Sequence, residues 1–303
     1  MIRVVFMGTP DYAKTILEAL FRDDAIEVVA VFTQPDKPVG RHKTITPSSV
    51  KVVAQQYNVP IFQPTSLRRE DFSETIRNLH PDYIVVAAFG QLLPQAILDI
   101  APCINLHASI LPAYRGASPI QEALLHGDNR TGVTAMLMDA GMDTGAILAI
   151  EEVAITPETM AQTLFVELAE VAAQLTLNVL HSYSRYTPHA QHSSKASYCT
   201  KITKEQGAVT FDNAQDLFNK YRAFTPWPGL FLESGLKLLS LGLIEVGTHH
   251  SEGEIVAIAP EYIDVGCTLG LIRLFEVQPP SKKAMKASDY IRGKRLGVGD
   301  RVL

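Results

Sequence analysis

Cysteine is scarce in this chain of 303 residues. The three cysteines, at Cys103, Cys199 and Cys267, lie far apart and form no CxxC pair. An odd number of widely spaced thiols fits neither a disulfide framework nor a cysteine-based zinc site. We therefore expect a reducing compartment, the cytoplasm, and no cysteine-bound metal.

Long apolar runs are missing as well. No run reaches the ~18 apolar residues of a membrane span, because the longest runs, such as Ile84 to Phe89, have the length of a strand. No cleavable hydrophobic segment follows Met1, which argues against secretion. Hydrophobic residues make up 47% of the chain and charged residues 19%, so the chain can bury a core and is not disordered. Its length, about twice that of a ~150-residue domain, predicts two domains.

Positive charge gathers in the C-terminal third. Residues 1–194 carry 13 Lys and Arg against 20 Asp and Glu, whereas residues 195–303 carry 14 against 12. From residue 281 onwards there are seven basic side chains and two acidic ones. A basic segment on an acidic protein suggests a polyanionic partner, and an ordinary solvated surface is the alternative.

The first half of the chain alternates apolar, strand-like runs with helical patterns. The strand-like runs are 2–7, 26–32, 84–88, 103–106 and 133–138, and the helical ones are 13–21, 48–56, 69–79, 118–126 and 159–181. Nearly continuous Val and Ile runs are typical of strands covered on both faces. The alternation predicts an α/β fold with a doubly wound, Rossmann-like parallel sheet.

The second half has a different pattern. Residues 183–200 are rich in Ser, His, Tyr and Pro, as in a linker. One helical pattern, 214–223, precedes short strand-like runs with glycine-containing turns at 236–244, 254–258, 262–265 and 269–277. Such closely spaced strands predict a small, OB-like β-barrel. We predict an N-terminal domain over 1–182, a linker over 183–200 and a C-terminal barrel domain over 201–303.

Gly8-Thr9-Pro10 follows the first strand, where a dinucleotide-binding protein has its glycine-rich turn. The G-x-G-x-x-G spacing is absent, so the segment does not indicate NAD binding. We interpret it as a tight turn from the strand into a helix that begins near Pro10.

Asn105 and His107 lie two residues apart at the carboxyl end of a predicted strand. Side chains alternate along a strand, so these two point to one side and Leu106 to the other. Ligands of open α/β sheets bind just beyond such strand ends. An amide and an imidazole aimed at one point can stabilise an oxygen that becomes negative, as acyl transfer requires. A purely structural histidine is the alternative.

Asp143 lies in a glycine-flanked loop after another predicted strand. Such a loop can bring the carboxylate near Asn105 and His107, where it would orient the imidazole and favour its protonated form. Asp-Thr-Gly also occurs in aspartic proteases, but those need two such aspartates, usually in all-β halves. A turn or helix-capping role is the alternative for Asp143.

Several short motifs resemble, in the same order, those of the methionyl-tRNA formyltransferase family. They are Met7–Pro10, Thr33–Pro38, Asn105–Pro112, Arg115–Ala117, Met142–Gly145 and Pro226–Gly229. The resemblance covers nearly the whole chain and is far more specific than any single motif. It implies transfer of the formyl group of 10-formyltetrahydrofolate to the α-amino group of methionine on initiator tRNA, for translation initiation.

The resemblance also implies three sets of site residues. The catalytic trio would be Asn105, His107 and Asp143. The folate site would be lined by Ser109, Ile110, Leu111 and Pro112. The tRNA would contact Lys37, Arg41 and Lys43 in a basic loop, and Lys282, Lys283 and Lys286 in the C-terminal domain. The partners would be initiator methionyl-tRNA and the folate co-substrate, for a monomeric, cytoplasmic enzyme that uses neither metal nor membrane.

The basic loop departs from the usual family pattern at two positions, His42 and Thr44, where glycine and often a second lysine are typical. Its charges suit the sugar-phosphate backbone of an acceptor stem. A solvated loop without a partner is the alternative.

Two other functions compete with this interpretation. Formyltransferases that act on a sugar-nucleotide amine or on glycinamide ribonucleotide share the Asn, His and Asp trio, but their small substrates need neither a basic loop nor a basic C-terminal domain. A non-catalytic RNA-binding protein would use the barrel and leave the trio unexplained. The basic segments together with the trio therefore favour the tRNA enzyme.

Overall fold

A computed structural model describes residues 1–39 and 43–302. The chain forms two compact units. Unit 1 consists of Met1–Pro119, Arg130–Ala154 and Thr163–Cys199, and unit 2 of Ile120–Asn129, Ile155–Gln162 and Thr200–Leu303. The chain therefore passes between the two units several times before it remains in unit 2.

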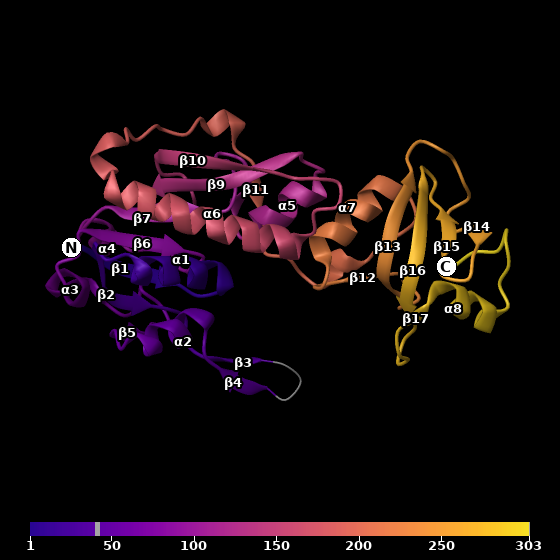
Figure 1. The fold of residues 1–303 in the computed structure, drawn as a ribbon, viewed down its shortest axis with the longest axis horizontal. Coiled ribbons are helices and arrows are strands. Elements are labelled where there is room, and N and C mark those ends of the chain that lie inside the picture. Colours follow the sequence, from indigo (N-terminus) through magenta and orange to yellow (C-terminus); the bar gives the residue numbers. More distant parts are fainter. Residues whose placement is uncertain (40–42, 303) are drawn as a thin grey trace. The chain divides into compact units, whose positions relative to one another are not determined.

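A seven-stranded sheet lies at the centre of unit 1, in the order β10-β9-β7-β6-β1-β2-β5 (Figure 1). Its strands are β1 (Ile2–Gly8), β2 (Ile26–Phe32), β5 (Ile61–Phe62), β6 (Tyr83–Ala87), β7 (Cys103–His107), β9 (Arg130–Leu137) and β10 (Ile147–Ala154). The neighbouring strands β5, β2, β1, β6 and β7 are parallel to one another. Strand β9 is antiparallel to β7, and β10 is antiparallel to β9. The doubly wound α/β fold is confirmed, with a mixed sheet at one edge.

The mixed edge has a local cause. The connection between β9 and β10 is too short for the crossover that parallel neighbours need, so the two strands form an antiparallel pair. Only two of the eight residues of β10, Leu148 and Val153, are buried, and this segment was not predicted as a strand. The predicted strand at 133–138 is part of β9, which begins at Arg130.

Helices pack against the sheet of unit 1. They are α1 (Asp11–Arg22), α2 (Ser49–Gln56), α3 (Ser73–Asn78), α4 (Gln95–Leu98) and α6 (Ala161–His181), whose first two residues belong to unit 2. Phe6, Leu17 and Phe32 are completely buried in this core. Among the described residues, α6 alone is long and apolar enough to cross a membrane, yet half of its most apolar window is buried.

The predicted basic loop contains a short hairpin. Strands β3 (Lys37–Val39) and β4 (Thr44–Thr46) pair in antiparallel fashion. At its base, the Asp36 carboxylate accepts hydrogen bonds from Lys51 Nζ at 2.7 Å and Gln63 Nε2 at 2.8 Å. These two bonds, the one from Lys51 first, hold the pKa of Asp36 below its usual value.

Unit 2 contains a six-stranded antiparallel sheet in the order β12-β13-β16-β15-β14, with β17 paired to β16. The strands are β12 (Leu230–Phe231), β13 (Lys237–Glu245), β14 (Ile255–Ile258), β15 (Ile263–Gly266), β16 (Leu271–Gln278) and β17 (Met285–Lys286), and the helices are α5 (Pro119–Leu125), α7 (Ala214–Phe224) and α8 (Ala287–Lys294). Ile255, Val265 and Leu274 are completely buried. The small C-terminal β domain is confirmed as an antiparallel sheet.

Within unit 1, the end of α6 is tied to the end of α1. His181 Nε2 lies 2.7 Å from Asp23 Oδ2, and the Ala25 N–H donates to the same carboxylate at 3.0 Å. The bond from His181, followed by the one from Ala25, holds the pKa of Asp23 below its usual value. This pair therefore stabilises unit 1 only while Asp23 is ionised.

We expect Asp23→Asn to lower the melting temperature near pH 6, with a difference that vanishes in acid. A carboxyl group with a depressed folded-state pKa adds stability above its unfolded pKa of about 3.9, and this stability is lost as the pH falls through the folded value. Thermal unfolding near pH 6 and below about pH 3 measures the effect. Asp24→Asn, at the exposed neighbouring carboxylate, is the matched control, and a deficit that persists in acid would contradict the prediction.

Candidate active site

The end of β7 holds two polar side chains inside unit 1. Strand pairing places Asn105 opposite Met136 and His107 opposite Thr134 on β9. Asn105 is only 9% exposed and His107 only 6%. Buried polar groups need hydrogen-bond partners, so both side chains must be satisfied by the protein or by a ligand.

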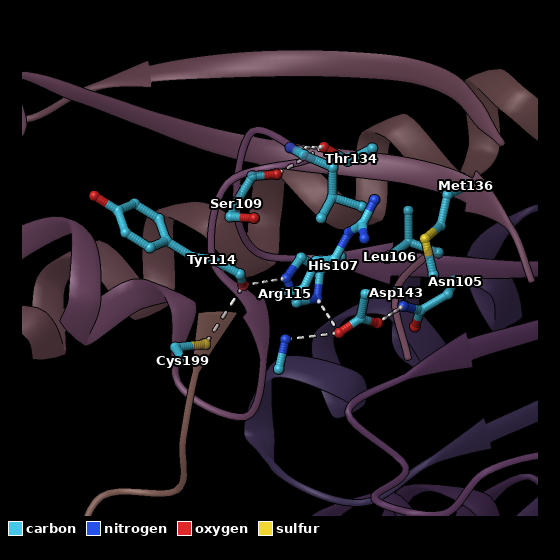
Figure 2. Close-up of polar contacts among 12 residues, drawn as sticks. Asn105, Leu106, His107, Ser109, Tyr114, Arg115, Thr134, Met136, Asp143 and Cys199 are labelled. Atoms are coloured by element: carbon cyan, nitrogen blue, oxygen red, sulfur yellow. Dashed lines mark hydrogen bonds and ion pairs between the residues drawn. The ribbon is translucent and has the colours of Figure 1, made fainter. Parts of the chain in front are cut away.

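Asp143 joins this pair from the loop between β9 and β10 (Figure 2). Its Oδ1 accepts a hydrogen bond from Asn105 Nδ2 at 3.4 Å, and its Oδ2 lies 3.7 Å from His107 Nδ1. The Gly116 N–H donates to Oδ2 at 2.8 Å. The structure therefore brings together the three residues of the predicted trio.

The backbone at Asp143 is strained. Its φ of 53° lies in the left-handed region, which residues other than glycine seldom adopt. Such strain persists only where surrounding contacts hold the residue in place, and it is common at functional sites. The loop conformation thus serves to aim the carboxylate at Asn105 and His107.

The second nitrogen of His107 has its own partner. His107 Nε2 lies 2.9 Å from the Tyr114 carbonyl oxygen (Figure 2). A carbonyl only accepts hydrogen bonds, so Nε2 carries the proton of the neutral ring, and Nδ1 is the nitrogen turned toward Asp143. When the ring is protonated, Nδ1–H becomes a donor next to the Asn105 amide.

The loop after β7 consists of the four predicted folate-site residues, Ser109, Ile110, Leu111 and Pro112. Thr134 Oγ1 holds this loop, because it donates to the Ser109 carbonyl at 2.7 Å and accepts from the Leu111 N–H at 3.1 Å. Ser109 and Leu111 are buried, whereas Ile110 and Pro112 are partly exposed. The loop is therefore fixed beside the trio and presents two apolar side chains.

A small parallel sheet supports the Gly116 donor. Strand β8 (Arg115–Gly116) pairs with β11 (Tyr198–Cys199). Gly116 has a φ of 124°, and a Cβ atom on it would lie 2.1 Å from the Cys199 carbonyl oxygen. Only glycine fits so close an approach with this backbone. Residues 198 and 199, predicted as linker, thus support the site.

Two of the predicted tRNA-binding residues, Lys37 and Lys43, lie on the surface of unit 1. Lys37 and Lys43 are exposed, and Lys37 Nζ donates a hydrogen bond to Gln34 Oε1. Arg41 and His42 lie outside the described residues. Neither lysine contacts the trio through a described hydrogen bond or ion pair, so a role for them requires a partner molecule.

The C-terminal lysines belong to unit 2. Lys282, Lys283 and Lys286 are all exposed. Lys286 Nζ pairs with Glu261 Oε1 at 2.7 Å. A phosphate that meets Lys286 would therefore compete with a surface carboxylate, which is a weak competitor.

Several groups at the site were not predicted from the sequence. They are the Tyr114 carbonyl, the Gly116 N–H, the Thr134 hydroxyl and the Gln191 side chain, whose contacts are given below. The Tyr114 carbonyl and the Gly116 N–H are backbone groups, and their role does not depend on the type of side chain, so residue identity could not reveal it. Gly116 stands in a recognised motif, whereas Gln191 lies in a stretch whose composition indicated only a linker.

Comparisons with known proteins identify the family to which this fold belongs. Residues 2–180 match the family model described as formyl transferase, and residues 201–295 match the one described as formyl transferase, C-terminal domain. An N-formyltransferase from Helicobacter canadensis, solved with folinic acid and dTDP-3-aminofucose, shares the fold with a TM-score of 0.68 and 18% identity, over 92% of this chain and 100% of that one. The chain is therefore a member of the formyl transferase family and has its fold.

HypX from Aquifex aeolicus, solved with tetrahydrofolic acid, has the same fold over 98% of this chain, with a TM-score of 0.61 and 15% identity. This chain spans about half of HypX, 48% of its length. Because the two solved structures are only 15% and 18% identical in sequence to this chain, they show a shared fold and nothing more.

Relatives of the same length identify one family among the formyltransferases. Methionyl-tRNA formyltransferases from a Nitratiruptor species, Wolinella succinogenes and Campylobacter jejuni are 56%, 54% and 48% identical to this chain, each over 99% of both chains. The chain belongs to the methionyl-tRNA formyltransferase family. The family recognised from its motifs is thereby confirmed.

We expect Gly116→Ala to lower kcat roughly 10- to 100-fold, because small displacements of positioning groups have effects of this size. The added Cβ would push β8 from β11 and disturb the donor to Asp143. Gly293→Ala in α8, where an added Cβ meets nothing within 4 Å, is the matched control and should be neutral or slightly stabilising. Formyl-transfer kinetics and thermal unfolding of both variants check this, and wild-type values for Gly116→Ala would contradict it.

Proposed function

We propose that this protein transfers the formyl group of 10-formyltetrahydrofolate to the α-amino group of methionine on initiator tRNA, through a tetrahedral intermediate, for translation initiation. The observation that carries the proposal is the buried cluster of Asn105, His107 and Asp143, in a chain 48–56% identical to full-length methionyl-tRNA formyltransferases. The sugar N-formyltransferase shares only the fold, so a sugar-nucleotide substrate has weaker support.

The attacking amine needs little activation. An α-amino group has an unperturbed pKa of roughly 7.7 to 8.0, so a useful fraction is neutral near pH 7. The formyl oxygen, by contrast, gains negative charge as the nitrogen attacks. The site therefore needs hydrogen-bond donors aimed at that oxygen more than it needs a strong base.

Asn105 and His107 supply these donors in the proposed reaction. The Asn105 amide carries two N–H groups and directs one at Asp143, at 3.4 Å, which leaves the other for the substrate oxygen. Protonated His107 offers Nδ1–H, because its Nε2 is engaged by the Tyr114 carbonyl. Both side chains are buried, so bonds to the developing charge meet little competition from water.

Asp143 orients the two donors and accepts the proton that the attacking nitrogen loses. Its Oδ2 lies 3.7 Å from His107 Nδ1, so the carboxylate faces the imidazole that it orients. Once the new C–N bond forms, the attacking nitrogen must lose a proton, which the Asp143 carboxylate accepts directly or through a water molecule. The tetrahedral intermediate then collapses, the bond between the formyl carbon and the folate N10 breaks, and N10 takes up a proton as tetrahydrofolate leaves. The Gly116 N–H holds one carboxylate oxygen at 2.8 Å and keeps it in place as the proton acceptor.

The loop from Ser109 to Pro112 holds the formyl donor beside the trio. 10-Formyltetrahydrofolate supplies the formyl group. The partly exposed Ile110 and Pro112 side chains suit the flat face of a pterin ring. The bonds from Thr134 keep the loop rigid, which favours a fixed position of the reacting carbon.

Basic groups on both units bind the tRNA backbone. Lys37 and Lys43 belong to unit 1, Arg41 lies between them in the sequence, and Lys282, Lys283 and Lys286 belong to unit 2. Contacts to phosphates position the nucleic acid without reading its sequence. We further propose that the enzyme acts as a cytoplasmic monomer, with residues 1–182 as the catalytic domain and 201–303 contributing to tRNA binding.

Asn105→Ala should lower kcat by roughly 10²- to 10³-fold, the effect of removing one oxyanion donor. Folate affinity should change little, because the bond forms mainly in the transition state. Asn178→Ala, at an exposed asparagine of α6, is the matched control. Formyl incorporation into charged initiator tRNA, with uncharged tRNA as the blank, measures the effect, and near-normal turnover of Asn105→Ala would remove this residue from the mechanism.

Replacing Lys282, Lys283 and Lys286 together by Ala should weaken tRNA binding and flatten its salt dependence. Each lost phosphate contact removes roughly 0.7 to 0.9 from the slope of log K against log salt, so the slope should fall by about two units or more. Folate affinity should stay at the wild-type value. The double change of Lys201 and Lys204 to Ala, at exposed lysines of the same unit, is the control, and a wild-type slope for the triple variant would show that these lysines are only solvated.

A further inference from the structure

The Gln191 side chain joins three segments of unit 1. Its Nε2 donates hydrogen bonds to the carbonyl oxygens of Asp143 at 2.9 Å and Gly145 at 2.8 Å. Its Oε1 accepts two bonds from the Arg115 guanidinium, from Nε at 3.1 Å and from Nη2 at 2.7 Å. One amide thus connects the Asp143 loop, strand β8 and the segment that precedes β11.

These contacts determine the orientation of the amide. Carbonyl oxygens only accept hydrogen bonds and a guanidinium only donates them. The NH₂ group of Gln191 must therefore face the loop, and its oxygen must face Arg115. Glutamate has the same shape and could keep the contact with Arg115, but it could not donate to the two carbonyls.

The bonds from Gln191 act on the strained part of the loop. Asp143 has a positive φ, and its own carbonyl is one of the two acceptors. At Gly145, the other acceptor, a Cβ atom would lie 1.7 Å from the Leu137 carbonyl oxygen, so this residue lies tightly against β9. The amide holds the loop backbone while Asn105 and Gly116 hold the carboxylate.

The bonds between Gln191 and Arg115 also affect the position of the Asp143 carboxylate, because Arg115 precedes the donor residue Gly116. Arg115 is only 3% exposed, and the next residue, Gly116, donates the 2.8 Å bond to Asp143. The segment that carries Gln191 is itself anchored, because His189 exchanges two backbone hydrogen bonds with Ile147, at 2.8 and 2.9 Å. Gln191 therefore links both groups that define where the Asp143 carboxylate lies.

We propose that Gln191 is a positioning residue for formyl transfer. It holds the Asp143 loop and β8 in the arrangement in which the carboxylate meets Asn105 and His107. Its described hydrogen bonds reach the trio through the backbone of Asp143 and Gly145 and through Arg115. This inference rests on the proposed function.

Gln191→Glu is the first test. We expect kcat to fall roughly 10- to 100-fold, because a misplaced catalytic group has an effect of this size, while tetrahydrofolate affinity and the KM for methionyl-tRNA stay within about twofold. Gln174→Glu is the matched control, because Gln174 is exposed on α6 and also donates to a side-chain oxygen, that of Asn178 at 3.0 Å. Wild-type kcat for Gln191→Glu would overturn the proposal.

A double-mutant cycle is the second test. Gln191→Leu is made in the wild type and in Asp143→Asn, and single-turnover rates are compared. If Gln191 acts by positioning the Asp143 charge, its loss should have at most about a twofold effect once that charge is gone. Equal fold-losses in both backgrounds would show that Gln191 acts independently of Asp143, and they would overturn the proposal.

Thermal unfolding and tetrahydrofolate binding separate positioning from stability. We expect Gln191→Glu to unfold cooperatively and to bind tetrahydrofolate like the Gln174→Glu control. Loss of both properties together with activity would assign Gln191 a purely structural role and overturn the proposal. A wild-type protein that formylates no methionyl-tRNA would instead refute the proposed function. Failure of the proposed function would thus be seen in the wild-type protein, and failure of the Gln191 proposal in the variants.

Discussion

The site depends on the placement of one carboxylate, that of Asp143, whose side chain is only 15% exposed. Removing a charge from water is unfavourable unless donors replace the lost hydration. Two donors form hydrogen bonds with the Asp143 carboxylate, the Gly116 N–H at 2.8 Å and the Asn105 amide at 3.4 Å, and His107 Nδ1 lies 3.7 Å away. The same carboxylate places the two proposed oxyanion donors, so its solvation and its chemistry use the same contacts.

Each of these neighbours depends on contacts with other parts of the chain. Asn105 and His107 are aligned by β6 and β9 on either side of β7. The Gly116 donor depends on β11, which is formed by the last two residues of unit 1 in the sequence. The central sheet thus supplies Asn105 and His107, whereas loops and very short strands supply Asp143 and the backbone groups around the trio, as is common where function lies in loops on a rigid scaffold.

Much of unit 1 could be predicted from residue patterns, because buried strands and amphipathic helices have distinct periodicities. The run 26–32 is β2 with the same limits, and 103–106 ends one residue short of β7. Strand β10 was missed because only two of its eight residues are buried and two glutamates, Glu151 and Glu152, interrupt its apolar run. The hairpin β3–β4 was interpreted as a loop, because its short, polar strands have three residues each and carry no periodicity to detect.

The amino-acid sequence by itself determined the class of fold, the shared side of Asn105 and His107 and, through its ordered motifs, the family. Those properties depend on local periodicity and residue identity. Tertiary structure alone decided that Gly116 donates to Asp143 and that Gln191 holds the Asp143 loop, since these partners lie 27 and 48 residues apart in the chain. Hydrogen bonds between such distant groups depend on how the segments pack, and no local pattern encodes that packing.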